Sequence, residues 1–326
     1  MNVLSLKPFI KPGITTFILM LISYLGIWMV NILLLPEFSY SGMDLRDNRW
    51  PVASHLLALL LLITINSILL RRFVLHFSII RTKSFLPVFF FLTFSVVWPE
   101  MRTNLFPHFF LTIFLISIEL FFGMYRNHRA VEPAFLGSLL ISLTSLIHPF
   151  YLLIFPILWI GWIILKSISV KSLLASFTGI AVPWIFHNSW FWYHGMELGF
   201  SPVFQTLNFS TVATEPISKS LLIYISILLF TGIISIIGLL SKLLDDSIQT
   251  RKNIYILVLT MLFTIAFSLF NSSLSHLYLP LTAFLVSVLM AHPFTLRKSL
   301  LYPLLFIVFS VCNILYLVFQ HLQPFQ

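Results

Sequence analysis

Two aspartates and two arginines stand close together in the segment "SYSGMDLRDNRWP", residues 39–51, between two long apolar runs. Asp44 and Asp47 are three residues apart, so both carboxylates lie on one face if the segment is helical. A carboxylate can take a proton from a hydroxyl group, and an arginine can hold a phosphate through two parallel hydrogen bonds. The segment therefore predicts Asp44 as a base or acceptor-orienting group, Asp47 as its helper or metal-side partner, and Arg46 and Arg49 as phosphate-binding residues.

The same residue types also fit a structural interpretation. In that alternative "DLRD" is a polar turn whose exposed ion pairs contribute about 0–1 kcal/mol each. A second charged group, Glu100 and Arg102 in "VVWPEMRTNLFP", has the same two interpretations: substrate binding or a surface ion pair. His194 and Glu197 begin the stretch 194–219, which is either an aromatic, polar lid over a lipid-facing cleft or a solvated linker.

Glu119 is an isolated carboxylate in the apolar run "FLISIELFFGM". An ionisable residue within a membrane costs about 2.5–3.5 kcal/mol on insertion scales, which makes it a functional candidate. The alternative is a protonated glutamate bonded to a carbonyl or a serine. No phosphate-binding glycine loop, H-E-x-x-H or metal-type Cys/His spacing occurs, so no metal site is predicted and the cofactor stays undetermined.

The composition indicates that lipid is the main solvent of this chain. Of its 326 residues 59% are hydrophobic, 35 are phenylalanine and only 9% are charged, whereas soluble domains carry roughly 25% charged residues. The single cysteine, Cys312, excludes an intramolecular disulfide. The first apolar run is too long for a signal-peptide core, so we expect it to be a retained span.

Apolar runs predict an all-α, polytopic transmembrane bundle that forms a single domain over residues 1–326. A bilayer core of about 30 Å needs about 20 residues of helix, so the two runs of fourteen residues are short. If the fifth and sixth runs, which meet at His148-Pro149, form a hairpin that crosses incompletely, nine spans remain. The eleven expected spans are 14–35, 51–70, 85–98, 105–125, 134–147, 150–166, 173–192, 220–241, 254–270, 277–293 and 300–320.

The basic residues predict how these spans are oriented, because cytoplasmic loops concentrate Lys and Arg. With the N-terminus inside and the C-terminus outside, 15 of the 19 basic residues fall inside and 4 fall outside: Arg46, Arg49, Arg102 and Lys219. The charges are scattered in pairs at helix ends, which argues against nucleic acid as a partner. We therefore expect a multi-pass protein of the plasma (inner) membrane.

The segment 71–84 has two interpretations. Phe73, Phe77 and Ile80 recur at helical spacing, with Arg72 on another face, which is typical of an amphipathic helix along the inner membrane surface. An ordinary basic linker is the alternative. On the opposite side we expect six of the ten acids, which makes the outer end the expected working surface: Glu37, Asp44, Asp47, Glu100, Glu197 and Glu215.

Residues 50–190 resemble a family of multi-pass integral membrane proteins from Bacteroidota. The resemblance rests on Asn66, on the "RTKSFLP" entry to the third span, and on the Gly179…Pro183 pair within "FTGIAVPWIF". It implies a multi-pass membrane fold and no particular activity.

The order of a short inner N-terminus, one span and an acidic outer loop resembles the glycosyltransferase-C type of membrane enzyme. That resemblance implies a transferase whose partners are membrane lipid and a polyprenyl-phosphate-linked sugar, with Asp44 and then Asp47 at the family's catalytic position. The first outer loop is shorter here than is usual in that family. The alternative from another class is a non-catalytic transporter or a scaffold of an envelope-assembly complex.

Overall fold

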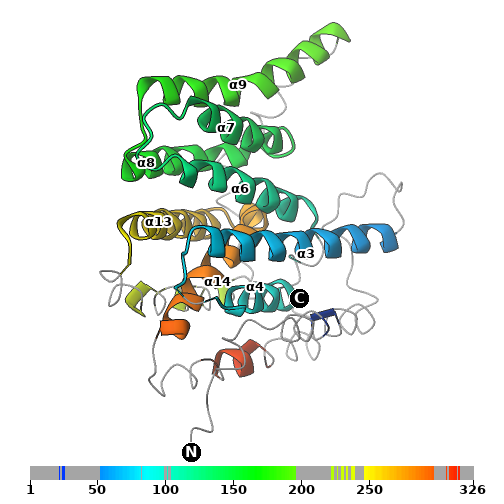
Figure 1. The fold of residues 1–326 in the computed structure, drawn as a ribbon. Coiled ribbons are helices and arrows are strands. Elements are labelled where there is room, and N and C mark those ends of the chain that lie inside the picture. The colour runs from blue at the N-terminus through cyan, green and yellow to red at the C-terminus, as the bar shows by residue number, and fades with distance from the viewer. Residues whose placement is uncertain are drawn as a thin grey trace, which may run out of the picture. The chain divides into compact units, whose positions relative to one another are not determined.

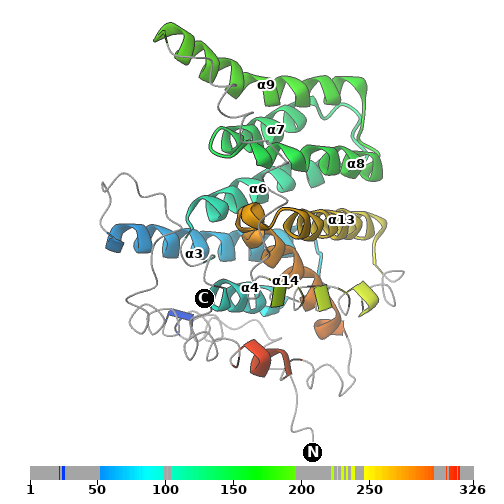
Figure 2. The same cartoon turned by 180° about the vertical axis from the view of Figure 1, so that it is seen from behind.

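The computed structural model describes residues 52–81, 83–98, 104–195 and 246–296, together with single residues elsewhere. These residues are all-α and contain no strand. The chain divides into two compact units (Figures 1 and 2). Unit 1 comprises residues 1–108, 218–245 and 276–326, and unit 2 comprises residues 109–217 and 246–275.

A helix lies at each expected span within the described ranges. In unit 1 these are α3 (Val52–His76), α4 (Leu86–Val97) and α14 (Leu279–Leu296). In unit 2 they are α6, which begins at Phe106 in unit 1 and ends at Gly123, then α7 (Val131–Ser145), the 3-10 helix η2 (Pro149–Ile154), α8 (Phe155–Leu165), α9 (Val170–Tyr193) and α13 (Ile248–Phe270). A second 3-10 helix, η4 (Ser272–Leu277), precedes α14. The spans expected at 14–35, 220–241 and 300–320 lie outside the continuously described ranges.

Four of these helices are long and apolar enough to cross a membrane: Ser54–His76, Phe106–Gly123, Val170–Tyr193 and Ile248–Phe270. The α4 helix has 12 residues and α7 has 15, which correspond to about 18 Å and 22 Å of helix. The structure is therefore that of a helical membrane protein, and the helices expected to be short are short. Only helices and closed barrels satisfy every backbone group in lipid, which explains the all-α content.

Residues 71–76 are the last turns of α3, and residues 77–81 form turns and bends before α4. The Arg71 guanidinium lies over the Phe85 ring, 4.3 Å from its centroid. Phe73 and Ile80 are both buried. In this arrangement Phe73 and Ile80 pack inward, whereas Leu75, Arg71 and Arg72 are exposed near the end of α3.

Phenylalanine rings form the core of unit 1, where α4 packs against α14. Phe90 is fully buried and lies 5.5 Å from Phe294 and 5.2 Å from Phe309, measured between ring centroids. Phe73 of α3 meets Phe284 of α14 edge-on at 5.8 Å. Such edge-on and tilted pairs are favourable beyond the area that they bury.

Small polar residues join α7 to α9 in unit 2. Ser138, Ser142 and Ser145 recur four and three residues apart, so they share one face of α7. The Oγ atoms of Ser138 and Ser176 are 2.7 Å apart, and Ser142 Oγ donates to the Ile180 carbonyl oxygen at 2.7 Å. We call this contact the serine seam; it consists of these four serines.

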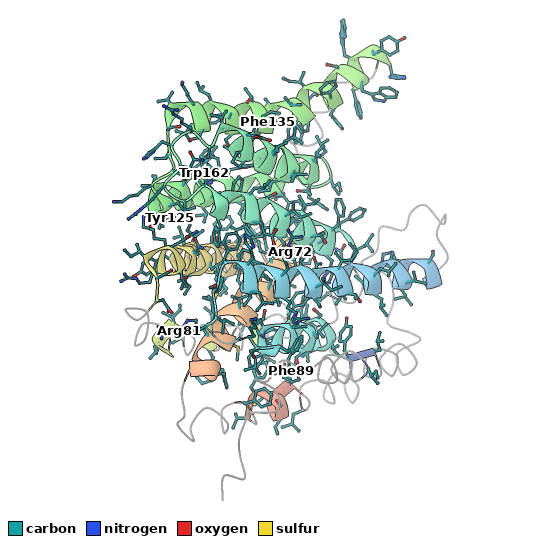
Figure 3. The ribbon with its side chains drawn as sticks, viewed as in Figure 1. Arg72, Arg81, Phe89, Tyr125, Phe135 and Trp162 are labelled. Carbon is teal, nitrogen blue, oxygen red and sulfur yellow. The ribbon has the colours of Figure 1, made fainter. Side chains whose placement is uncertain are left out.

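Two indole N–H groups complete the serine seam. Trp159 Nε1 donates to Ser176 Oγ at 3.1 Å, and Trp184 Nε1 donates to Ser145 Oγ at 3.0 Å. Gly179 lets the two backbones approach, because a Cβ placed there would lie 2.6 Å from the carbonyl oxygen of Phe135, which is labelled in Figure 3. Close approach through small residues is a common way for helices to associate where lipid supplies no hydrophobic driving force.

Candidate functional site

Most residues predicted from the sequence to bind substrate or to react lie outside the described residues. The structure therefore leaves those predictions as they stand. They are Asp44, Arg46, Asp47, Arg49, Glu100, Arg102 and Glu197.

His194 is described, at the C-terminal end of α9, where it is exposed. Its Nδ1 lies 2.9 Å from the Trp190 carbonyl oxygen, and its ring lies 4.3 Å from the Trp190 ring. These two contacts are to its own helix. Among the described residues, they link His194 to the end of α9 and not to another predicted site residue.

Glu119 lies in α6, four residues before that helix ends at Gly123. It is half-buried. A carboxylate one turn from a helix end and partly exposed is less costly than one at the bilayer centre, where the insertion cost is highest. This position favours neither of the two interpretations of Glu119.

His108 and Asn66 form a buried polar connection in unit 1. Asn66 Nδ2 donates to the His108 carbonyl oxygen at 3.0 Å, and His108 Nε2 donates to the Met101 carbonyl oxygen at 2.8 Å. Both side chains are fully buried. This connection fixes the start of α6 against α3 and satisfies groups that would otherwise be costly in lipid.

Within the described residues no three His, Cys, Asp or Glu side chains gather in a way that could hold a metal ion.

All basic residues described in unit 2 lie at one end of its helices. The connection from α6 to α7 spans only Met124–Ala130, and the connection from α8 to α9 spans Lys166–Ser169, so both connections are short. A contact between Lys252 and Tyr125 brings the start of α13 to the same end. The residues at this end are Arg126, Arg129, Lys166, Lys171, Arg251 and Lys252.

Two of these cations lie over the ring of Tyr125, which is labelled in Figure 3, and Lys166 is joined to one of them through the Leu165 carbonyl oxygen. The Arg126 guanidinium carbon and the Lys252 Nζ each lie 5.3 Å from the ring centroid. Lys166 and Arg126 both act on Lys252 by charge repulsion. We call Tyr125, Arg126, Lys166 and Lys252 the Tyr125 cluster. Within the described part of the chain, none of its three cations forms an ion pair with a carboxylate.

Two residues of the Tyr125 cluster occupy the left-handed backbone region. Arg126 has φ 58° and Lys166 has φ 55°. The Arg126 N–H donates to the Leu165 carbonyl oxygen at 3.1 Å, so the two corners are tied together. Lys166 ends α8, with its N–H directed to the Ile163 and Trp162 carbonyl oxygens. A residue with a Cβ in this region costs about 1–2 kcal/mol, and such strain is frequent at functional sites.

Two buried polar groups without a hydrogen-bond partner lie near the ends of α8 and α13 that carry the Tyr125 cluster. Asn253 is fully buried, and neither its amide nitrogen nor its amide oxygen has a hydrogen-bond partner. The Trp162 Nε1 is likewise buried and unpaired. Asn253 is three residues from Ile256, which packs on Gly161, so it lies on the α8-facing side of α13, one turn nearer the cluster. A buried polar atom without a partner costs about 1–3 kcal/mol, so a ligand that accepted hydrogen bonds here would offset that cost.

The Tyr125 cluster thus combines positive charge without carboxylate partners with an aromatic ring, and the buried donors of Asn253 and Trp162 lie on the same helices. Together these groups can bind an anion. The sequence alone did not predict this cluster, because its basic residues, Arg126, Lys166 and Lys252, were used only to orient the spans in the membrane. The signal that could have revealed it is Tyr125-Arg126 at the end of one apolar helix and Lys252-Asn253 at the start of another.

Comparison of the chain with protein-family models, with curated proteins and with solved structures gives no match.

Proposed function

We propose that this is a multi-pass inner-membrane protein of the cell envelope, with eleven spans, its N-terminus in the cytoplasm and its C-terminus outside. The observation that supports this orientation is that the six basic residues described in unit 2 lie at one end of its helices. Cytoplasmic ends concentrate Lys and Arg, so this end is the cytoplasmic one.

The proposed activity is that of a transferase using a polyprenyl-phosphate-linked sugar at the outer face. In this orientation the segment 39–51 lies outside, beside the membrane, where the head group of a lipid-linked donor lies. Asp44 takes the proton of the acceptor hydroxyl, with Asp47 as its helper, because a positioned carboxylate is a general base. Arg46, Arg49 and Arg102 hold the donor phosphate, since guanidinium groups bind phosphate bidentately. Glu100, His194 and Glu197 contribute further contacts.

The alternative is a transporter or a scaffold that catalyses no transfer. A transporter needs polar groups near the middle of the membrane, where substrates bind. In the serine seam the polar side chains are bonded to each other, to an indole or to a carbonyl, and Glu119 lies near a helix end. The serine-seam groups would therefore have to exchange their present partners to bind a transported substrate.

The two functions are separated by exchanging Asp44→Asn and Asp47→Asn together. The amide is nearly isosteric with the carboxylate, so loss of a base should lower the transfer rate by about 10²–10⁴. The measurement is transfer of label from a pool of polyprenyl-phosphate-linked sugars in membranes that contain each variant at equal protein level.

Glu119→Gln is the matched control, because it also neutralises one carboxylate, and it should leave transfer unchanged. Full transfer by the double aspartate variant would reject the proposed activity. Loss of function in Glu119→Gln alone, with both aspartates dispensable, would favour transport.

A further inference from the structure

We infer that the Tyr125 cluster, together with the Asn253 amide, binds the phosphate group of an anionic membrane lipid. The inference does not rest on the proposed transferase, whose residues belong to a different part of the chain. It starts from charge. Arg126 and Lys252 lie over the same Tyr125 ring, and the Arg126 N–H joins the end of α8 next to Lys166, so three like charges that repel one another are gathered at one point. None of the three has a carboxylate partner in the described part of the chain. A bound phosphate offsets that repulsion through charge-assisted hydrogen bonds.

Three described carboxylates belong to the same helices or to the residues next to them. Glu132 is exposed in the first turn of α7, and Asp246 directly precedes the Ser247 cap of α13. Glu119 lies one turn before the end of α6. For Arg126, Lys166 and Lys252 themselves, no ion pair with a carboxylate is found in the described part of the chain, so their positive charge is not offset there.

Two cationic residues of the Tyr125 cluster occupy backbone positions that glycine adopts more easily. Glycine adopts the left-handed region without the steric cost that a Cβ brings. Arg126 and Lys166 nevertheless occupy that region, at φ 58° and 55°. Strained backbone positions are frequent at functional sites, and here the two strained residues are both cations. Binding of a ligand by both side chains would explain why they are retained.

The buried groups point to a ligand that accepts hydrogen bonds. The Asn253 amide can donate two, and it is unpaired and fully buried at the residue that follows Lys252. Its neighbour Arg251 has a buried Nε that is also unpaired. Phosphate oxygens accept several hydrogen bonds at once, so one phosphate can use both the charges and these donors.

The surrounding surface fits a lipid as the source of the phosphate. The Tyr125 cluster lies where apolar helices end, and two of them, α6 and α13, are long enough to cross a membrane. Next to it the apolar side chains of Ile163 and Tyr255 are exposed, at 58% and 47%. Basic pockets between transmembrane helices on the cytoplasmic side are typical sites for anionic lipid head groups.

The test uses Arg126→Gly with Lys166→Gly, because glycine removes both charges while relieving the backbone strain. The control, Arg129→Gln with Lys171→Gln, removes two charges from the same end without touching the Tyr125 cluster. Native mass spectrometry of the full chain in detergent measures binding of dioleoyl phosphatidic acid and of phosphatidylcholine with the same acyl chains. Competition with inorganic phosphate distinguishes a lipid from a free phosphate, and the melting temperature of each variant is measured in parallel.

We expect phosphatidic acid to bind more tightly than phosphatidylcholine. The glycine variant should lose about thirtyfold in affinity, since each surface cation contributes about 1 kcal/mol to binding an anionic lipid. Its melting temperature should be unchanged or higher, and the control should bind as the unmodified chain does. Asn253→Leu, which keeps all three charges of the Tyr125 cluster, should also weaken binding.

Equal losses in the glycine variant and its control would mean that general surface charge attracts the lipid, which overturns the inference. So would phosphatidylcholine binding as tightly as phosphatidic acid. Displacement of the lipid by an equal concentration of inorganic phosphate would assign the site to free phosphate instead. If the glycine variant does not fold, Lys252→Gln replaces it, with the same expected direction and Lys171→Gln as its control.

Discussion

The serine seam and the Tyr125 cluster lie in the same compact unit, and they differ in how their polar atoms are satisfied. In the seam, Ser138 bonds Ser176, and two tryptophans donate to serine hydroxyls. In the Tyr125 cluster, three cations lack a carboxylate partner within the described residues. The amide of Asn253, the residue after Lys252, is buried without a hydrogen-bond partner. Polar groups that are fully bonded hold helices together, whereas unpaired ones need a ligand to offset their cost.

This difference gives opposite expectations for substitutions. Changes in the serine seam should lower stability and leave lipid binding alone. Changes in the Tyr125 cluster should alter binding with little loss of stability, or even with a gain.

The largest effect is expected at Gly179, where α7 and α9 approach most closely. Gly179→Ala places a Cβ 2.6 Å from a backbone carbonyl oxygen, so the helices must separate. We expect the free energy of unfolding to fall by about 1–3 kcal/mol, as for an overpacked core. Gly123→Ala is the matched control, because nothing lies within 4 Å of its added Cβ. Unfolding in detergent measures both variants, and equal stabilities would contradict a tight α7–α9 contact.

A smaller loss is expected from Ser176→Ala, which removes the hydroxyl bonded to both Ser138 and Trp159. Hydrogen bonds between membrane helices contribute about 0.6 kcal/mol each on average, so the loss should be about 1 kcal/mol. Ser189→Ala is the control, since its hydroxyl is exposed and bonds only the Ile185 carbonyl oxygen of its own helix. Ser176→Ala should lower the free energy of unfolding, and Ser189→Ala should not.

The comparison becomes sharper with Asn253→Leu, for which a gain is expected. Leucine has the same branched skeleton as asparagine and removes an unpaired buried amide, so the ligand-free protein should become more stable by about 1 kcal/mol. Asn66→Leu is the counterpart, because Asn66 is equally buried but donates to the His108 carbonyl oxygen. Asn66→Leu should therefore lower stability. If both variants changed the free energy of unfolding in the same direction, hydrogen bonding of the buried amide would not decide its contribution to stability.

Helix positions were predictable here because long apolar runs leave few alternatives in lipid. The expected span 173–192 is found as Val170–Tyr193, and 105–125 is found as Phe106–Gly123. The α9 helix begins earlier than its apolar run, since Ser169 and Ser172 form a capping box. The α13 helix likewise begins at Ile248, before the expected start at residue 254, because Ser247 caps the helix by accepting from the Thr250 N–H.

The Tyr125 cluster could not be predicted in the same way. Its members lie at the ends of three helices that are far apart in sequence, and their convergence depends on how α6, α8 and α13 pack. The left-handed backbone conformations of Arg126 and Lys166 could not be predicted either, because neither position carries the glycine that normally indicates such a conformation. The predicted residues Asp44, Asp47 and Arg102 remain predictions, since they lie outside the described residues.

The central claim is that the helices of unit 2 cross the membrane with their basic ends in the cytoplasm. Replacing Cys312, the one cysteine of the chain, with serine gives a background for single-cysteine labelling. His128→Cys lies between α6 and α7 at the basic end, His194→Cys lies at the opposite end of α9, and both positions are exposed. In intact cells a membrane-impermeant maleimide should label the cysteine at position 194, and should label position 128 only after the membrane is opened. Labelling of both positions in intact cells, or of position 128 alone, would contradict the account.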